Sequence, residues 1–172
     1  MVQLYSPAVM IIIETKIGGP RPKAISDRLP FDGAIHMETI GLAGGLWVLW
    51  DSSQVEVSEL ASTEQEIHAI VKVISSNSSW VLSAIYASPR YAERCLLWNN
   101  LTTVASLHSL PWVLAGDFNE VLIGEDKFGG RAVNISRALR FKECLDSCRM
   151  IDLGFSGARY TWSNRRPVTD LI

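Results

Sequence analysis

Short apolar runs bounded by turn-forming residues restrict the fold of this chain more than any other feature. The first, Ala8–Ile13, is continuous and rich in β-branched residues, which is typical of a strand buried on both faces. Val55–Leu60 and Ile67–Ile74 alternate with period two, which indicates half-exposed antiparallel strands. The same reasoning predicts further strands at Leu46–Trp50, Trp80–Tyr86, Trp112–Ala115, Ile151–Gly154 and Tyr160–Ser163.

Two segments show helical spacing instead. Tyr91–His108 carries apolar residues one helical turn apart, at Leu97, Leu101, Val104 and Leu107. Asn134 is a suitable N-cap for a second helix that runs to about Met150. Its expected apolar side is Ile135, Leu139, Leu145 and Cys148. Strands followed by helix, strand, helix and strand predict an α/β domain with a mixed, largely antiparallel sheet arrangement.

The chain has 172 residues, of which 48% are hydrophobic, and this is enough for one domain that covers residues 1–172. The Gly- and Pro-rich stretch Gly18–Pro30 is expected to form a loop. The net charge of -2 excludes a general basic field for nucleic acid, so any such contact has to be local.

An intracellular location, nuclear or cytoplasmic, is expected. The chain has three cysteines, Cys95, Cys144 and Cys148, an odd number that cannot form a disulfide framework and indicates a reducing compartment. Cys144 and Cys148, one helical turn apart, favour core or boundary packing over zinc binding. The N-terminal apolar run stops at Glu14, too early to span a bilayer, and no basic segment of a signal peptide precedes it. Neither secretion nor membrane insertion is therefore expected.

Carboxylates stand where two of the expected strands end. Glu14 follows Ala8–Ile13, and Asp117 follows the strand that starts at Trp112. A carboxylate at the end of a buried strand is rigid and partly desolvated, which makes a divalent cation a plausible partner. Asn119 would share a face with Asp117 if the strand continued, although Asp and Asn also favour a plain turn.

Several motifs together resemble one protein family. They are Glu14-Thr15-Lys16, Tyr86-Ala87-Ser88-Pro89, Gly116-Asp117-Phe118-Asn119-Glu120, and the segment from Gly154 to Asn164 that contains Thr161-Trp162-Ser163-Asn164. In this order they resemble the endonuclease/exonuclease/phosphatase superfamily. More narrowly, the chain resembles the apurinic-type endonuclease domain of plant LINE-type, non-LTR retrotransposon polyproteins.

That resemblance implies a partial four-layered α/β sandwich and a hydrolase that cleaves DNA phosphodiesters with Mg²⁺ or Mn²⁺. Glu14 would bind the metal, Tyr86 would approach the scissile phosphate, and Asp117 would activate the water. Asn119 would hold a phosphate oxygen. The substrate-binding rim would carry Trp162 and Asn164, the DNA phosphate backbone would be the partner, and no protein partner is implied.

The resemblance also predicts a domain truncated at both ends. The family's catalytic His motif is not matched, because His36, His68 and His108 stand in other contexts. Loss of one such group costs about 10²–10³ in rate, so weak or absent activity is expected. Two alternatives stay open, namely a non-catalytic remnant or interaction fragment, and a phosphoinositide or sphingomyelin phosphoesterase of the same superfamily.

Overall fold

The computed structural model describes residues 2–40, 43–130, 132–157, 160 and 163. The chain forms two compact units, each continuous in space but not in sequence. The first contains Met1–Arg90 and Ser109–Phe118, and the second contains Tyr91–His108 and Asn119–Ile172. Within the described residues, no helix is both long and apolar enough to cross a membrane.

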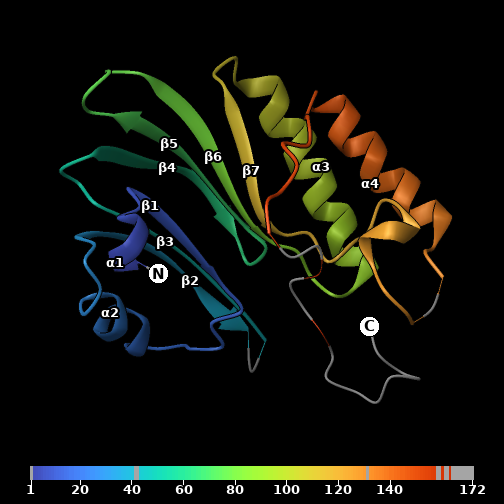
Figure 1. Ribbon diagram of the computed structural model, residues 1–172, viewed down its shortest axis with the longest axis horizontal. Helices are drawn as coiled ribbons and strands as arrows, with labels where there is room; N and C mark the ends of the chain where they lie inside the picture. The colour runs from blue at the N-terminus through green and yellow to red at the C-terminus, as the bar shows by residue number, and fades with distance from the viewer. Residues whose placement is uncertain (1, 41–42, 131, 158–159, 161–162, 164–172) are drawn as a thin grey trace. The chain divides into compact units, whose positions relative to one another are not determined.

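The first unit contains two β-sheets (Figure 1). One sheet is antiparallel with the strand order β1-β3-β2, and its strands are β1 (Val9–Ile13), β2 (Gly33–Ile40) and β3 (Ala43–Trp50). The other has the order β4-β5-β6-β7, formed by β4 (Val55–Thr63), β5 (Glu66–Val73), β6 (Ser79–Tyr86) and β7 (Trp112–Asp117). Its first three strands are antiparallel and β7 runs parallel to β6.

The core of the first unit lies between these sheets. Leu46 and Val48 of β3 pack in one cluster with apolar side chains of the four-stranded sheet. The buried members of that cluster are Leu46, Val48, Val55, Ile67, Val71, Leu82 and Ala84. Two short helices, α1 (Val2–Tyr5) and α2 (Arg21–Ser26), complete the unit. Packing of one apolar sheet face on the other therefore fixes where the strand ends lie.

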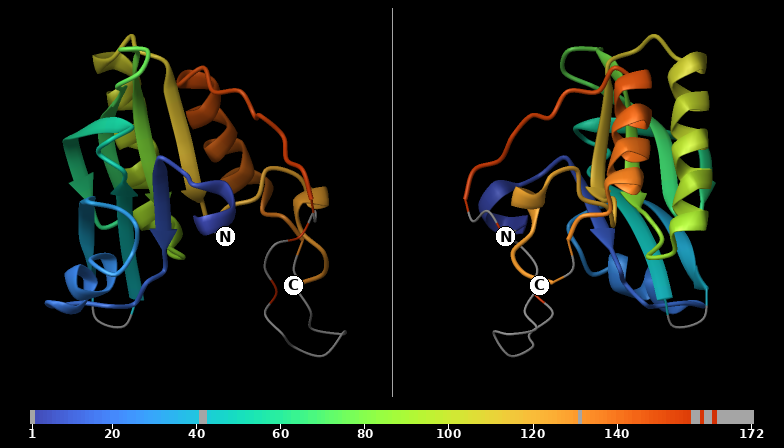
Figure 2. Two further views of the ribbon diagram at one scale, coloured as in Figure 1. Left: turned by 60° about the vertical axis from the view of Figure 1, so that its left-hand side comes forward. Right: turned by 90° about the vertical axis from the view of Figure 1, so that its right-hand side faces the viewer.

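The second unit is built on two helices, α3 (Tyr91–Leu107) and α4 (Ile135–Ser147), which lie side by side (Figure 2). The rings of Trp98 and Phe141 stack with their centroids 4.6 Å apart, and the thiol of Cys144 donates to the carbonyl oxygen of Trp98. A short 3₁₀ helix, η1 (Gly124–Asp126), precedes α4. The predicted N-cap is confirmed, since the Asn134 side chain accepts a hydrogen bond from the amide of Arg137.

The structure corrects several expectations about individual elements. β1 is an edge strand with half-buried residues, not a strand buried on both faces. β5 is more buried than its alternation predicts, because its polar residues Glu66 and His68 are enclosed rather than solvated. Residues 21–26 of the expected loop form α2, and residues 33–40, which include His36, form β2.

Two further corrections concern the second unit. The exposed residues Ile135 and Leu139 do not face the core of α4, which is formed by Ala138, Phe141, Cys144 and Cys148. Residues 151–154 form no strand, and Leu153 is 90% exposed. The side chain of Asp152 instead accepts a hydrogen bond from the amide of Gly154, which closes a local turn.

Candidate functional site

Tyr86 and Asp117 are brought together by the parallel pairing of β6 and β7. The two residues lie opposite each other at the carboxyl ends of these strands, which run side by side in Figure 1. The amide of Ala87 donates to the carbonyl oxygen of Asp117 over 2.8 Å, which continues the pairing one residue beyond the strand. The carboxyl ends of strands in α/β sheets are the usual location of ligand sites. This pair therefore forms the first part of a candidate site.

The glycine before Asp117 is required by its surroundings. Gly116 has a φ of 142°, a backbone conformation that side chains rarely adopt. A Cβ atom added there would collide with the backbone carbonyl oxygen of Ile85 on β6. The Gly-Asp dipeptide thus lets β7 approach β6 closely enough for Asp117 to stand beside Tyr86.

Glu14 and Lys16 occupy the turn that follows β1. Both have left-handed backbones, with φ values of 55° and 53°, which is uncommon for side chains of this size. Two hydrogen bonds hold the turn against the start of β3, from the amide of Thr15 to Gly45 and from the amide of Lys16 to Gly44. Such backbone strain persists only where neighbouring contacts impose it, and it concentrates at functional sites.

The turn brings two opposite charges together. The ammonium nitrogen of Lys16 lies 2.8 Å from a carboxylate oxygen of Glu14, and both side chains are about half exposed to solvent, at 55% and 48%. The hydrogen bond and the charge of Glu14 raise the pKa of Lys16 above its usual value. Lys16 is therefore fully protonated at neutral pH. The sequence motif contained Lys16, but its contact with Glu14 was not predicted.

The pKa of Tyr86 connects the Tyr86–Asp117 pair with the Glu14–Lys16 pair. Burial raises the pKa of the Tyr86 phenol, and the charges of Glu14 and Asp117 raise it further, while Lys16 opposes them. Strand β1 also packs against β6 and β7. Because charges act on a phenol mainly at short range, the turn that carries Glu14 and Lys16 lies on the same side of the sheet as Tyr86 and Asp117. We call these four residues the strand-end site.

Both carboxylates of this site are exposed to solvent. Asp117 is exposed, and Glu14 is 48% exposed. The turn after the edge strand β1 is open to solvent, which leaves the Glu14 carboxylate about half exposed. Exposure leaves both carboxylates accessible to a hydrated ion or to a phosphate ester.

The donor set of the strand-end site suits a hard divalent cation in part. Within the described residues, no group of three or more His, Cys, Asp or Glu side chains is placed to bind a metal. The site offers two carboxylates, from Glu14 and Asp117, and one ammonium group, from Lys16, which pairs with Glu14. Mg²⁺ is commonly held by one or two carboxylates, with water and substrate phosphate as its other ligands. The residues present therefore fit Mg²⁺ bound in that open mode.

The other predicted residues are not brought to this site by the described structure. β7 ends at Asp117, and Asn119 belongs to the second unit with a left-handed φ of 47°. The strand therefore does not continue to Asn119, and the backbone turns after Asp117, which was the other possibility that the sequence left open. Trp162 and Asn164 lie outside the described residues.

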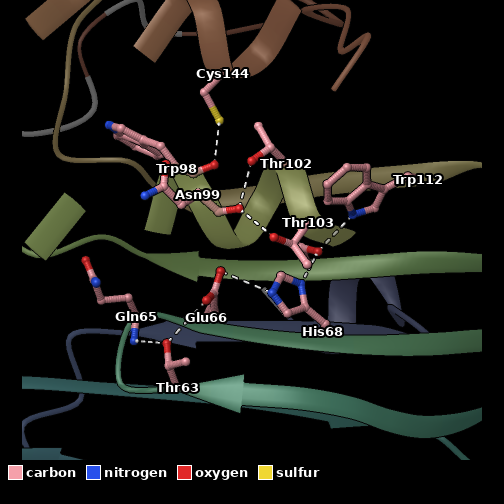
Figure 3. Close-up of polar contacts among 11 residues, drawn as sticks. Thr63, Gln65, Glu66, His68, Trp98, Asn99, Thr102, Thr103, Trp112 and Cys144 are labelled. Carbon is pink, nitrogen blue, oxygen red and sulfur yellow. Dashed lines mark hydrogen bonds and ion pairs between the residues drawn. The ribbon is translucent and has the colours of Figure 1, made fainter. Parts of the chain in front are cut away.

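A second polar cluster in the first unit looks catalytic by residue type but is enclosed (Figure 3). The His68 imidazole hydrogen bonds through Nδ1 with Ser83 Oγ at 2.6 Å, and its Nε2 lies 3.1 Å from a Glu66 oxygen. The indole nitrogen of Trp112 donates to the same Ser83 oxygen over 2.8 Å. Ser83 has no exposed surface, so no substrate reaches it, and the cluster stabilises the sheet instead.

Comparison with solved structures finds the fold of this chain in several other proteins. An AP endonuclease from Archaeoglobus fulgidus matches with a TM-score of 0.63 and 15% identity, over 84% of this chain and 62% of that one. The AP endonuclease LMAP from Leishmania major matches with a TM-score of 0.62 and 13% identity, over 86% and 59% of the two chains. The chain has the endonuclease/exonuclease/phosphatase fold. This confirms the predicted α/β class with mixed and antiparallel sheets.

A third match of the same fold has nucleic acid bound. The 3′ phosphatase NExo from Neisseria, solved with a product DNA hairpin, has a TM-score of 0.62 and 15% identity, over 85% of this chain and 63% of that one. This chain therefore spans about three fifths of the length of these three structures. No protein-family profile matches the sequence, and no curated protein matches it significantly.

Proposed function

We propose that the strand-end site binds Mg²⁺ or Mn²⁺ and cleaves phosphodiesters. The observation that carries this proposal is the pairing of Tyr86 with Asp117 at the ends of β6 and β7, against which β1, the strand that leads to Glu14, is packed. Glu14 and Asp117 would hold the cation together with water and a phosphate oxygen. When bound, the cation supplies positive charge to the phosphate in the transition state.

The side chains of the site have chemically distinct tasks. The raised pKa of Tyr86 keeps its phenol protonated at neutral pH, so it donates a hydrogen bond to a phosphate oxygen without adding negative charge. The exposed carboxylate of Asp117 accepts a proton from the attacking water. Glu14 keeps the cation beside this pair. Lys16 neutralises Glu14 when no cation is bound.

We assign DNA as the substrate and a LINE-type retrotransposon endonuclease domain as the source. The support is the ordered set of motifs, from Glu14-Thr15-Lys16 through Gly116-Asp117-Phe118-Asn119 to Thr161-Trp162-Ser163-Asn164. NExo, which has the same fold, was solved with a DNA hairpin. In this assignment Asn119 holds a phosphate oxygen, while Trp162 and Asn164 contact the DNA.

Turnover by residues 1–172 is expected to be slow. Of the histidines in the first unit, His36 hydrogen bonds with Ser26 and lies edge-on to the Trp47 ring, and His68 is enclosed with Ser83. Neither imidazole is free to stabilise a developing charge at the strand-end site. A missing electrostatic group of this kind lowers the rate by about 10²–10³-fold.

Nicking of supercoiled plasmid in Mg²⁺ tests the proposal. We expect slow nicking that EDTA abolishes and that Asp117→Asn lowers by about 10²-fold or more. The matched control is Glu56→Gln, which removes an exposed carboxylate on β4 that pairs with Lys72. Its nicking rate should equal that of the wild type.

The outcomes separate the alternatives. Nicking that is equally fast in the Asp117→Asn variant would show that another nuclease is responsible. Mg²⁺ binding without cleavage of any DNA would favour the non-catalytic remnant. Hydrolysis of a phosphoinositide or sphingomyelin, without nicking of plasmid or abasic-site DNA, would favour the lipid phosphoesterase.

A further inference from the structure

We infer that Arg94 and Glu120 are positioning residues, which together hold Asn119 in the conformation that binds phosphate. The inference rests on the proposed function for the role of Asn119. It concerns the second unit alone, where α3 carries Arg94 and the segment after Asn119 begins with Glu120.

The two side chains form a buried ion pair. Arg94 Nη2 donates to Glu120 Oε2 over 2.7 Å, and the two side chains are only 3% and 8% exposed. A buried charge is costly without its partner, so each side chain holds the other firmly in place. Glu120 is thus anchored to α3 although it lies in a segment without regular secondary structure.

Glu120 directly follows a residue with a strained backbone. Asn119 has a φ of 47°, in the left-handed region, and its side chain is exposed. Asn tolerates this conformation better than most residues, but a single such residue in an open turn needs neighbours that fix it. Because the peptide between Asn119 and Glu120 joins the two, fixing Glu120 restricts the backbone of Asn119.

Arg94 also lies near an aromatic ring of α3 that a side chain of α4 contacts. Its guanidinium lies 5.7 Å from the centre of the Tyr91 ring, and the guanidinium of Arg137 lies 4.9 Å from the same centre. The Tyr91 phenol hydrogen bonds with Cys95, which raises the pKa of Tyr91. A continuous set of contacts therefore runs from α4 through Tyr91 and Arg94 to Glu120. The residue after Asn119 is thus tied to both helices of this unit.

The test has one readout that does not depend on catalysis. Hydrogen exchange by NMR is measured for the amides of residues 118–121 in the wild type, in Glu120→Gln and in Arg94→Lys. Glu120→Gln keeps the size of the side chain, and Arg94→Lys keeps the charge, so at least one should fold. The control Glu143→Gln removes an exposed carboxylate that pairs with Arg140 on α4.

We expect the amides of residues 118–121 to exchange at least about 10-fold faster in Glu120→Gln, with β5 unchanged. Unchanged exchange in both folded variants would overturn the inference, whether or not the protein cleaves DNA. In nicking assays, we expect Glu120→Gln to lower the rate as Asn119→Ala does, and the double variant to be no slower than Asn119→Ala. If Glu120→Gln lowered the nicking rate by the same factor in the wild type and in the Asn119→Ala variant, the inference would also be overturned.

If the wild type did not nick DNA, the proposed function would be contradicted. The hydrogen exchange of residues 118–121 would still decide whether the ion pair positions Asn119. A loss of thermal stability alone would indicate a purely structural pair. The Glu120→Asp variant separates a positioning role from a purely structural one, because it keeps the negative charge. We expect its amide exchange rates at residues 118–121 to be close to those of the wild type. If Glu120→Asp exchanged as fast as Glu120→Gln, the charge would not be what holds Asn119.

Discussion

Tyr86 and Asp117 lie opposite each other where the parallel strands β6 and β7 end. Their proximity depends on backbone pairing and on the absence of a side chain at Gly116. The strand-end site is therefore built into the sheet on this side, while Glu14 reaches it from a turn after an edge strand. Substitutions in the sheet should therefore change the stability of the protein, whereas substitutions in the turn should change cation binding.

Substitution of Gly116 by Ala should destabilise the protein strongly. The new Cβ would meet the carbonyl oxygen of Ile85, and the φ of 142° is itself unfavourable for Ala. We expect a loss of about 2–4 kcal/mol in the free energy of unfolding, measured with urea. Gly124→Ala is the control, because its Cβ would enter open space. A loss for Gly116→Ala as small as that of the control would contradict the close approach of β6 and β7.

Removal of the Ser83 hydroxyl tests the enclosed polar cluster. Ser83→Ala leaves the indole N–H of Trp112 and Nδ1 of His68 without this hydrogen-bond partner. Buried polar groups that lose their partners should cost about 2–4 kcal/mol of unfolding free energy in total. Ser62→Ala removes an exposed hydrogen bond to Glu59 and should change stability by less than about 0.5 kcal/mol. Thermal and urea unfolding of both variants would check this.

The sequence predicts most of the core elements because their patterns are long and strongly apolar. β3, β6, α3 and β7 appear within a few residues of their expected bounds, since each carries a continuous apolar run or a clear helical repeat. α2 was missed because Gly and Pro surround it, although Pro20 and Pro22 suit the first turn of a helix. The strand expected at residues 151–154 was wrong, because an alternating pattern does not supply a pairing partner.

The site could be predicted in its residue types but not in its geometry. The strand ends and the motifs point to Glu14, Tyr86 and Asp117. Which strands lie next to each other depends on the strand order, and local sequence patterns do not encode that order. The left-handed turn at Glu14 and its ion pair with Lys16 depend on hydrogen bonds to Gly44 and Gly45, which are distant in sequence. The pairing of Arg94 with Glu120 is equally non-local.

Alkaline pH should weaken the fold through Tyr86. Its pKa is raised in the folded protein above the usual 10.0, so the folded state favours the neutral phenol. The stability from this preference is fully present below the unfolded pKa and is lost as the pH rises through the folded pKa. We expect the free energy of unfolding to fall more steeply above about pH 10 in the wild type than in Tyr86→Phe. Parallel pH profiles for the two proteins would contradict the shift.

The same phenol reports on its neighbours. Glu14→Gln and Asp117→Asn each remove a negative charge that opposes ionisation, so each should lower the pKa of Tyr86. Lys16→Gln removes a positive charge that favours ionisation, and should raise it. Ultraviolet titration of tyrosinate, with Tyr86→Phe to identify the signal, measures these shifts. Shifts of the opposite signs would show that these charges do not act on the Tyr86 phenol as proposed.

Lys16 should compete with a cation for Glu14. Its ammonium group lies 2.8 Å from the Glu14 carboxylate, and its raised pKa keeps it charged at neutral pH. Removal of that charge in Lys16→Gln should tighten Mg²⁺ binding by about 3-fold or more at low ionic strength. Lys72→Gln, which removes an exposed lysine paired with Glu56, is the control. Weaker binding in Lys16→Gln than in this control would show that Lys16 supports the cation instead.

Calorimetric titration of Mg²⁺ tests most directly whether Glu14 and Asp117 form one cation site. We predict a single site in the wild type, with affinity reduced about 10-fold or more by Glu14→Gln and by Asp117→Asn. The double variant should lose less than the two single losses combined, because both carboxylates serve the same ion. Glu56→Gln should bind as the wild type does. Unchanged affinity in either single variant, or fully independent losses in the double variant, would contradict a shared site.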